Sequence, residues 1–200
     1  MSDRILGFVA LLMALTVVGL ALFWNPIPDD QPLPRPGLPL GGDFTLQSAD
    51  GPVSLQDLRG KVALVYFGYT FCPDICPTAL VAVADGIEQL EPDEKKDVAV
   101  IFVSVDPERD TPEGLKQYTD FFHPNIIGVT GSEEQVRKVA RDYGAFYVRQ
   151  AGVTAGGDYV VDHSADIYVV ARNGRVVDKI THGSTPARIA QAIRTSLRVK

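Results

Sequence analysis

The only two cysteines of this 200-residue chain are separated by three residues and lie between a strand-like and a helix-like segment. Residues 62–67 form a continuous apolar run, Cys72 and Cys76 follow it, and Pro77 opens a stretch with helical spacing of apolar residues. Proline fits the first turn of a helix, where a missing N–H loses no partner. The order of strand, turn with two thiols, and helix therefore predicts an α/β fold with both sulfurs near a helix N-terminus.

This position favours ionised sulfur. The first turn of a helix has free N–H groups and the positive end of the helix dipole, and both lower the pKa of a nearby thiol. A thiolate attacks disulfides and binds soft metal ions. The pair therefore has three interpretations: a metal site, a redox dithiol, or a structural disulfide. We disfavour the structural disulfide, because so short a loop gains little stability from chain entropy.

The rest of the chain alternates strand-like and helix-like segments. We expect strands at 62–68, 98–105, 126–129, 146–148, 166–170 and 175–180, helices at 77–90, 111–122, 132–143 and 184–197, and a hairpin over 43–55. The early alternation predicts parallel crossovers, and the turn at Asn173-Gly174 adds an antiparallel edge. The predicted fold class is α/β, a thioredoxin-like sandwich with an N-terminal β-hairpin and inserted elements.

The N-terminal region predicts a membrane anchor. Residues 5–24 are uncharged and mostly apolar, which is long enough for a helix to cross a bilayer. We interpret 1–24 as an uncleaved transmembrane anchor, in preference to a signal peptide or a buried core helix, because the apolar run continues through Trp24. Residues 25–42 are rich in proline and glycine and predict a semi-rigid linker, which leaves 43–200 as the folded domain.

Charge and flanking residues indicate a location. Arg4 and the amino terminus favour a cytoplasmic N-terminus, so the domain is expected on the far side of the membrane. An arginine-rich mitochondrial presequence is not present, so we expect a bacterial cytoplasmic membrane with the domain in the periplasm. The net charge of −6 argues against nucleic acid as a partner.

Three histidines are available as further ligands. His163 lies in a polar, glycine-containing loop that leads into an apolar strand, and loops of this kind often carry ligands. The residues alone leave a ligand and a surface histidine equally plausible. His123 is expected to cap a helix end, and His182 is expected to be exposed.

Three segments together resemble a known family. Residues 71–77 (Phe-Cys-Pro-Asp-Ile-Cys-Pro), 105–112 (Val-Asp-Pro-Glu-Arg-Asp-Thr-Pro) and 161–164 (Val-Asp-His-Ser) are similar to those of the Sco/SenC family. These are membrane-anchored, thioredoxin-like copper proteins that act in cytochrome c oxidase assembly, and the resemblance covers about residues 40–198. It implies that Cys72, Cys76 and His163 bind one copper ion, as Cu(I) or Cu(II). The two methionines, Met1 and Met13, lie outside the predicted domain, which excludes a methionine-rich copper carrier.

The resemblance favours one function among three. The first is a copper metallochaperone that delivers copper to the dinuclear copper centre of cytochrome c oxidase subunit II. A thioredoxin-like reductant and possibly another copper donor protein are its implied partners. The second is a thiol–disulfide oxidoreductase for the cysteines of that copper site, with Cys72 attacking and Cys76 resolving. The third is a peroxidase, which would not require His163.

The absence of a proline distinguishes the first function from the second. The loop before the strand at 166–170 has His163-Ser164 where thioredoxin-type reductases have a proline, which favours metal binding over disulfide exchange. Three acidic positions are assigned no role: Asp74 is interpreted as a turn residue, Asp162 as a loop cap or an orienting partner of His163, and Asp106-Pro107 as a strand-terminating turn.

Overall fold

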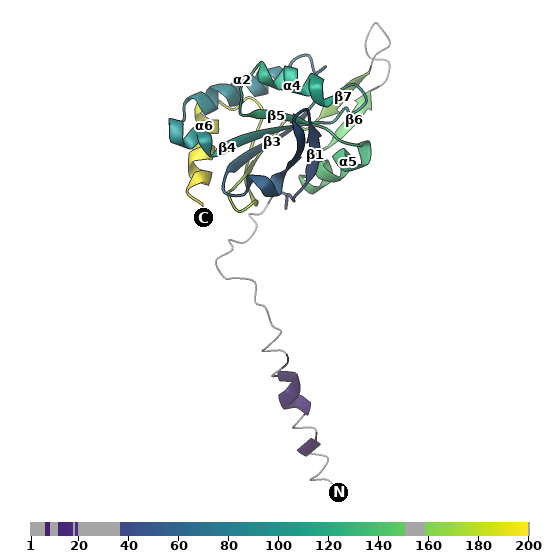
Figure 1. Ribbon diagram of the computed structural model, residues 1–200, viewed down its shortest axis with the longest axis vertical. Coiled ribbons are helices and arrows are strands. Elements are labelled where there is room, and N and C mark those ends of the chain that lie inside the picture. The colour runs from purple at the N-terminus through teal and green to yellow at the C-terminus, as the bar shows by residue number, and fades with distance from the viewer. Residues whose placement is uncertain (1–6, 9–11, 18, 20–36, 151–158, 200) are drawn as a thin grey trace. The chain divides into compact units, whose positions relative to one another are not determined.

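A computed structural model describes residues 7–8, 12–17, 19, 37–150 and 159–199 (Figure 1). The chain divides into two units, Met1–Leu33 and Pro34–Lys200. Residues 7–8, 12–17 and 19 of the first unit are helical, and no helix in the described residues is long and apolar enough to cross a membrane. Most of the predicted anchor and linker lies outside these residues, so the boundaries at 24 and 42 stay predictions.

A five-stranded sheet forms the centre of the second unit. Its strands, in spatial order, are β5 (Ile126–Val129), β4 (Val98–Ser104), β3 (Val62–Gly68), β8 (Ile167–Val170) and β9 (Val176–Ile180). β3, β4 and β5 are parallel, whereas β8 and β9 run antiparallel. Every residue of β3 and β4 is buried, which explains their unbroken apolar sequences. The predicted α/β fold is confirmed, with parallel crossovers early and an antiparallel edge late.

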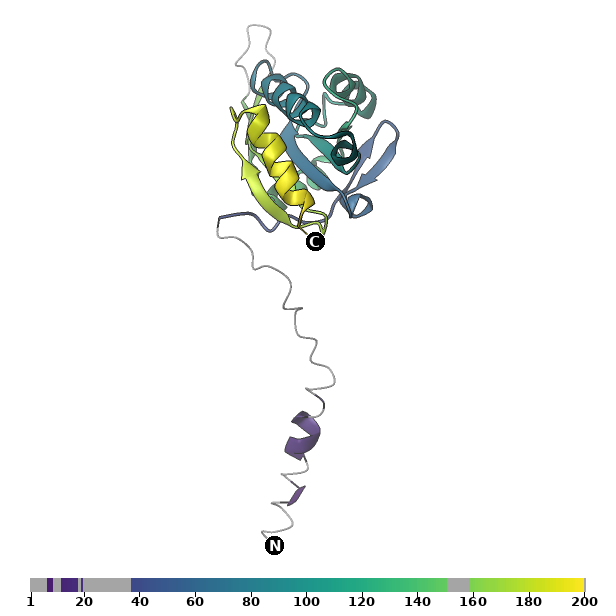
Figure 2. The same cartoon turned by 90° about the vertical axis from the view of Figure 1, so that its left-hand side faces the viewer.

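Five helices surround this sheet among the described residues of the second unit. They are α2 (Ile75–Glu88), α3 (Pro92–Lys96), α4 (Pro112–Asp120), α5 (Glu133–Asp142) and α6 (Pro186–Leu197). α2 packs beside α6, and α4 lies against β5 (Figure 2). The side chains of Thr111 and Thr185 cap α4 and α6, and each helix then opens with a proline. The short α3 was not predicted.

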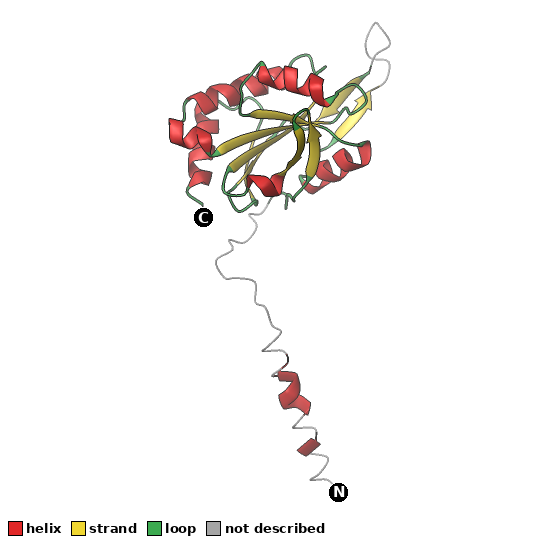
Figure 3. Ribbon diagram, in the orientation of Figure 1, coloured by secondary structure: helices red, strands yellow, loops and turns green. Residues whose placement is uncertain are grey.

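The helices lie on both faces of the sheet (Figure 3). Successive residues of a strand point to opposite faces. Tyr66 of β3 contacts Cys76 of α2, whereas its neighbour Phe67 packs on Tyr143 at the end of α5, with ring centroids 5.8 Å apart. α2 and the end of α5 therefore cover opposite faces of β3, as in a sandwich.

Two hairpins lie outside the central sheet. The predicted N-terminal hairpin pairs β1 (Thr45–Ser48) with β2 (Gly51–Ser54), followed by a 3-10 turn η1 (Leu55–Leu58). The second pairs β6 (Tyr147–Gln150) with β7 (Val160–His163). The sequence predicted β6 but placed His163 in a loop. That prediction is wrong in part, because His163 is the last residue of β7. Residues 151–158 between the two strands lie outside the described residues.

Candidate metal centre

The turn after β3 places both thiols at the start of α2. The helix begins at Ile75, two residues earlier than predicted, so Cys76 is its second residue and Pro77 its third. The side chain of the N-cap residue Asp74 makes no capping hydrogen bond. The sulfur of Cys72 instead accepts the backbone N–H of Cys76 at 3.4 Å. The Cys72 sulfur thus caps the helix N-terminus in place of the Asp74 side chain. This hydrogen bond stabilises the thiolate form of Cys72, as the sequence predicted.

Gly68, the last residue of β3, makes room for this arrangement. A Cβ at this position would lie 2.5 Å from Cys76 Sγ and 2.8 Å from the Phe102 ring. Cys76 itself has no exposed surface, and Cys72 is 8% exposed. Gly68 was not predicted from the sequence as a functional residue. A glycine at the end of an otherwise bulky apolar strand was the available signal, because such glycines mark close approaches.

His163 meets the thiols from the opposite side, at the end of β7. Its Nε2 lies 3.3 Å from Cys76 Sγ, and its Nδ1 lies 2.9 Å from the carbonyl oxygen of Ser164. A carbonyl oxygen only accepts, so Nδ1 carries a proton, and Nε2 is the ring nitrogen left to bind a metal ion. The ligand atoms of Cys72, Cys76 and His163 all lie within 4.8 Å of one another. The structure therefore brings the three predicted site residues together.

The two thiols have opposite proton affinities. The pKa of Cys72 is lowered to about 3, chiefly because the Cys76 thiol donates a hydrogen bond to its sulfur, and backbone N–H groups also favour the thiolate. The pKa of Cys76 is raised well above its usual range by that same hydrogen bond to Cys72 and by burial. The pair therefore holds one proton at neutral pH, on Cys76.

Aromatic side chains line the site. The Tyr66 hydroxyl lies 3.8 Å from Cys76 Sγ, and burial raises the Tyr66 pKa, so this phenol stays neutral and donates to sulfur. The rings of Tyr66 and Tyr69 lie edge-on to the His163 ring, at centroid distances of 6.3 and 5.8 Å. These rings restrict the orientation of the imidazole and exclude water from the buried sulfur.

Asp74 has its predicted role, whereas Asp162 does not orient His163. Asp74 accepts a hydrogen bond from Thr78 and is exposed, as a turn residue would be. Asp162 accepts from Gln150 at 2.8 Å, so the group that orients His163 is the Ser164 carbonyl and not this carboxylate.

Asp106 is more than the end of a strand. Its side chain is fully buried and carries an ion pair with Arg109 and a hydrogen bond from the Tyr159 hydroxyl. Four residues later, buried Asp110 accepts hydrogen bonds from the Thr70 backbone N–H and hydroxyl. The loop after β4 therefore contacts the cysteine turn and the histidine hairpin. The interpretation of Asp106-Pro107 as a strand-terminating turn was incomplete.

The other two histidines lie away from the site. His182 is exposed, as predicted. His123 is 8% exposed and bridges the end of α4 to α2: its Nδ1 accepts the Asn125 N–H, and its Nε2 lies 2.9 Å from Glu88. His123 is therefore a buried structural group in place of the simple helix cap that the sequence predicted.

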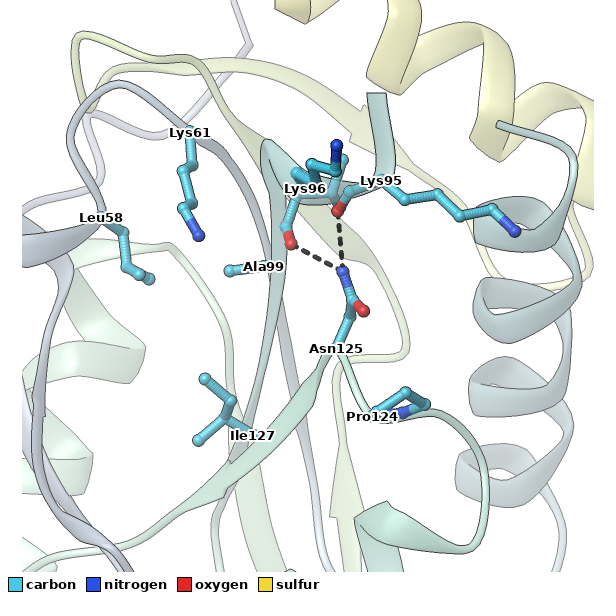
Figure 4. Close-up of a pocket in the computed structure, with 9 residues that line it drawn as sticks. Leu58, Lys61, Lys95, Lys96, Ala99, Pro124, Asn125 and Ile127 are labelled. Atoms are coloured by element: carbon cyan, nitrogen blue, oxygen red, sulfur yellow. Dashed lines mark hydrogen bonds between the residues drawn. The ribbon is translucent and has the colours of Figure 1, made fainter. Parts of the chain in front are cut away.

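Cys72 and His163 face an apolar pocket of about 370 Å³. Its lining includes Tyr69, Cys72, Ile75, Phe146, Val161 and His163. A larger pocket of about 550 Å³ lies at the other end of the strands, near the starts of β3 and β4 (Figure 4). There Lys95 and Lys96 form ion pairs with Glu88 and Asp93, and the Asn125 amide donates to two backbone carbonyls. These polar groups serve the fold, so we assign the chemistry to the smaller pocket.

Fold and site together define a thioredoxin-like domain with a Cys-Cys-His centre. The SCO1/SenC family model matches residues 34–198. A SCO2-like protein of Rickettsia conorii is 38% identical over 156 residues, covering 78% of this chain and 76% of its own length. This chain belongs to the SCO1/SenC family, and the resemblance identified from the sequence is confirmed.

Two solved structures bear on the site. Bradyrhizobium japonicum ScoI, solved with copper bound, is 37% identical with a TM-score of 0.71, and the match covers 79% of this chain and 99% of that one. BsSco, described as having a disulfide switch and as a member of the Sco family of cytochrome c oxidase assembly proteins, is 29% identical with a TM-score of 0.65. That match covers 85% of this chain and all of BsSco.

Proposed function

We propose that this protein is a copper metallochaperone. Cys72, Cys76 and His163 bind one copper ion, which the protein delivers to the dinuclear copper centre of cytochrome c oxidase subunit II. The observation that carries the proposal is the convergence of two sulfurs and a free imidazole nitrogen within 4.8 Å of one another. Thiolates select soft ions such as Cu(I), and imidazole suits both copper states. Membership of a family with a copper-bound relative supports this choice of metal.

The two sulfurs have different parts in loading. Cys72 lines the pocket and is already a thiolate, so it is the first to meet an incoming ion. Cys76 is buried behind it and must release its proton to bind. Stepwise exchange of thiolate ligands between two proteins moves the ion without free copper in solution. Ile75 and Phe146, which line the pocket, and Phe71, next to Cys72, are exposed and provide an apolar contact surface for such a partner.

Copper titration of the reduced domain tests the proposal. We expect one copper per chain, with an intense sulfur-to-Cu(II) absorption band. His163→Ala should lower the affinity at least about tenfold and shift or remove the band, because an outer hydrogen-bond partner of a ligand alone contributes about 10–100-fold. His182→Ala is the matched control, since His182 is exposed and remote from the thiols. Equal affinity in the His163→Ala and wild-type proteins would remove His163 from the site.

Cu(I) affinity should depend on pH with the slope of a single proton. Cys72 is deprotonated above about pH 3, whereas the raised pKa of Cys76 keeps its proton on the sulfur until the ion displaces it. The affinity should therefore rise about tenfold per pH unit, because one proton is released for each ion bound. Chelator competition between pH 7 and 9 measures this slope. A hundredfold rise per unit would show that both thiols are protonated in the free protein.

The proposal includes a location and further partners. An anchor at residues 1–24 would hold the domain in the periplasm at a bacterial cytoplasmic membrane, close to its acceptor. The dithiol there needs a thioredoxin-like reductant, because the periplasm is oxidising, and copper comes from a donor protein. Fractionation with protease treatment of spheroplasts tests this location. Recovery of the full-length protein in the cytosol would contradict it.

A second function shares the same residues. Both cysteines are free, their sulfurs are close together, and Cys72 has the low pKa of an attacking thiol. A thiol–disulfide oxidoreductase for the cysteines of the oxidase subunit is therefore the alternative. It predicts turnover of an oxidised acceptor peptide at the same rate in wild-type and His163→Ala proteins. A copper chaperone predicts transfer that depends on His163.

A further inference from the structure

The hairpin that carries His163 is separate from the central sheet. Among the described strands, β6 and β7 pair only with each other. Backbone pairing with the central sheet therefore does not fix the position of His163. Side-chain contacts have this role, and they gather at Tyr159, the residue immediately before β7.

Arg109 makes most of these contacts. Its guanidinium carbon lies 3.8 Å from the centroid of the Tyr159 ring, and its Nη1 donates to the Tyr159 carbonyl oxygen at 3.0 Å. Its Nε donates to the Asp106 carboxylate, which also accepts the Tyr159 hydroxyl at 2.6 Å. Asp106, Arg109 and Tyr159 thus form a closed set of contacts, which we call the clamp.

Burial makes the clamp strong. The Asp106 side chain is fully buried, and a buried carboxylate is costly unless it is paired. Arg109 supplies the paired charge, while Arg149 of β6 lies farther away, at 3.7 Å. Hydrogen bonds to charged groups are roughly twice as strong as neutral ones. The start of β7 is therefore fixed to the loop that follows β4.

A contact made by a residue of β7 also holds this strand in place. The Val161 backbone N–H donates to the Tyr69 hydroxyl at 3.2 Å. The Tyr69 ring centroid lies 5.8 Å from that of His163 and 5.6 Å from the Arg109 guanidinium carbon. Tyr69 precedes Cys72 in the turn after β3. The strand with the imidazole is thereby held both to the β4 loop and to the turn with the thiols.

We propose that Arg109 is a positioning residue for the metal centre. Through Tyr159 it holds β7 where His163 Nε2 reaches Cys76 Sγ, although Arg109 itself binds no metal. The effect of Arg109 on copper affinity rests on the proposed function. The next residue, Asp110, accepts hydrogen bonds from Thr70 of the cysteine turn, so one loop supports both halves of the site.

A double-mutant cycle tests the proposal. Arg109→Gln and Tyr159→Phe are each made with and without His163→Ala, and Cu(I) affinity is measured by chelator competition. With His163 present, each clamp variant should bind copper about tenfold more weakly. Without His163, neither should cause a further loss, because the clamp acts through that residue. Tyr147→Phe is the matched control: this buried β6 hydroxyl has no hydrogen-bond partner among the described residues.

Two results would overturn the proposal: unchanged affinity in both clamp variants, or a loss that persists without His163. The second would mean that the clamp supports the thiols or the fold in general. If Arg109→Gln does not fold, Tyr159→Phe decides alone, since it removes a single hydroxyl.

A copper-free measurement separates this inference from the proposed function. Hydrogen exchange at the amides of Val161 and Ser164, which donate to Tyr69 and to the Phe146 carbonyl, reports opening of the hairpin. Exchange should be about tenfold faster in Arg109→Gln and unchanged in Tyr147→Phe. Equal rates in both would overturn the clamp. A wild-type chain that binds no copper would contradict only the proposed function.

Discussion

Replacing Cys76 with serine should lower the Cu(I) affinity by well over about 100-fold. Loss of an outer partner of a ligand already costs about 10–100-fold in affinity, and here one of the three proposed ligands is itself lost. The serine hydroxyl is a hard, protonated oxygen that does not replace a thiolate for a soft ion. Chelator competition at pH 7 with reduced protein measures the change.

The Cys72→Ser variant distinguishes the roles of the two sulfurs. It should also abolish tight binding, and it should lower the pKa of Cys76 towards that of an ordinary buried thiol, because the neighbouring thiolate that raises this pKa is gone. Circular dichroism should show the wild-type fold in both variants, since each change is nearly isosteric. A Cys76→Ser protein that binds Cu(I) within about tenfold of wild type would exclude the three-ligand site.

Gly68→Ala should damage the site through packing alone. The new methyl group would lie 2.5 Å from Cys76 Sγ, so either the sulfur or the end of β3 must move. Overpacking of this kind destabilises a core by about 1–3 kcal/mol. We expect the free energy of unfolding to fall by that amount in denaturant titration. We also expect Cu(I) affinity to fall at least about tenfold, because one ligand is displaced.

Gly86→Ala is the matched control for Gly68→Ala. Gly86 lies in α2, where an added Cβ would come within 3.0 Å of Ile189 of α6, far along the helix from the thiols. It should change stability without changing copper affinity. If both variants bind copper equally well, the close approach at Gly68 has no bearing on the site.

The sequence alone predicts the parts of this fold that local patterns determine. β3 and β5 begin and end where expected, since a strand buried on both faces gives an unbroken apolar run. The capping residues Thr111, Ser132 and Thr185 likewise mark three helix starts. The two thiols at a helix N-terminus follow from the same local signals.

Long-range contacts were not predictable in this way. His163 is 87 residues from Cys76, and only the family resemblance joined them before the structure did. β7 is four residues long and has no clear alternation, so it was mistaken for a loop. Asp106 resembled an ordinary turn residue because its partners, Arg109 and Tyr159, meet it only when the β6–β7 hairpin is in place.

The separation of 87 positions between Cys76 and His163 also affects the stability of the protein. An ion held by both residues cross-links the chain across that distance. A permanent cross-link that closes a loop of this size raises the free energy of the unfolded chain by roughly 4–5 kcal/mol, because it reduces the entropy of that chain. The bound ion would thus act as a reversible cross-link that stabilises the folded chain. On the proposed function, the copper-loaded protein would resist unfolding and proteolysis, and it would lose this protection once the ion is delivered.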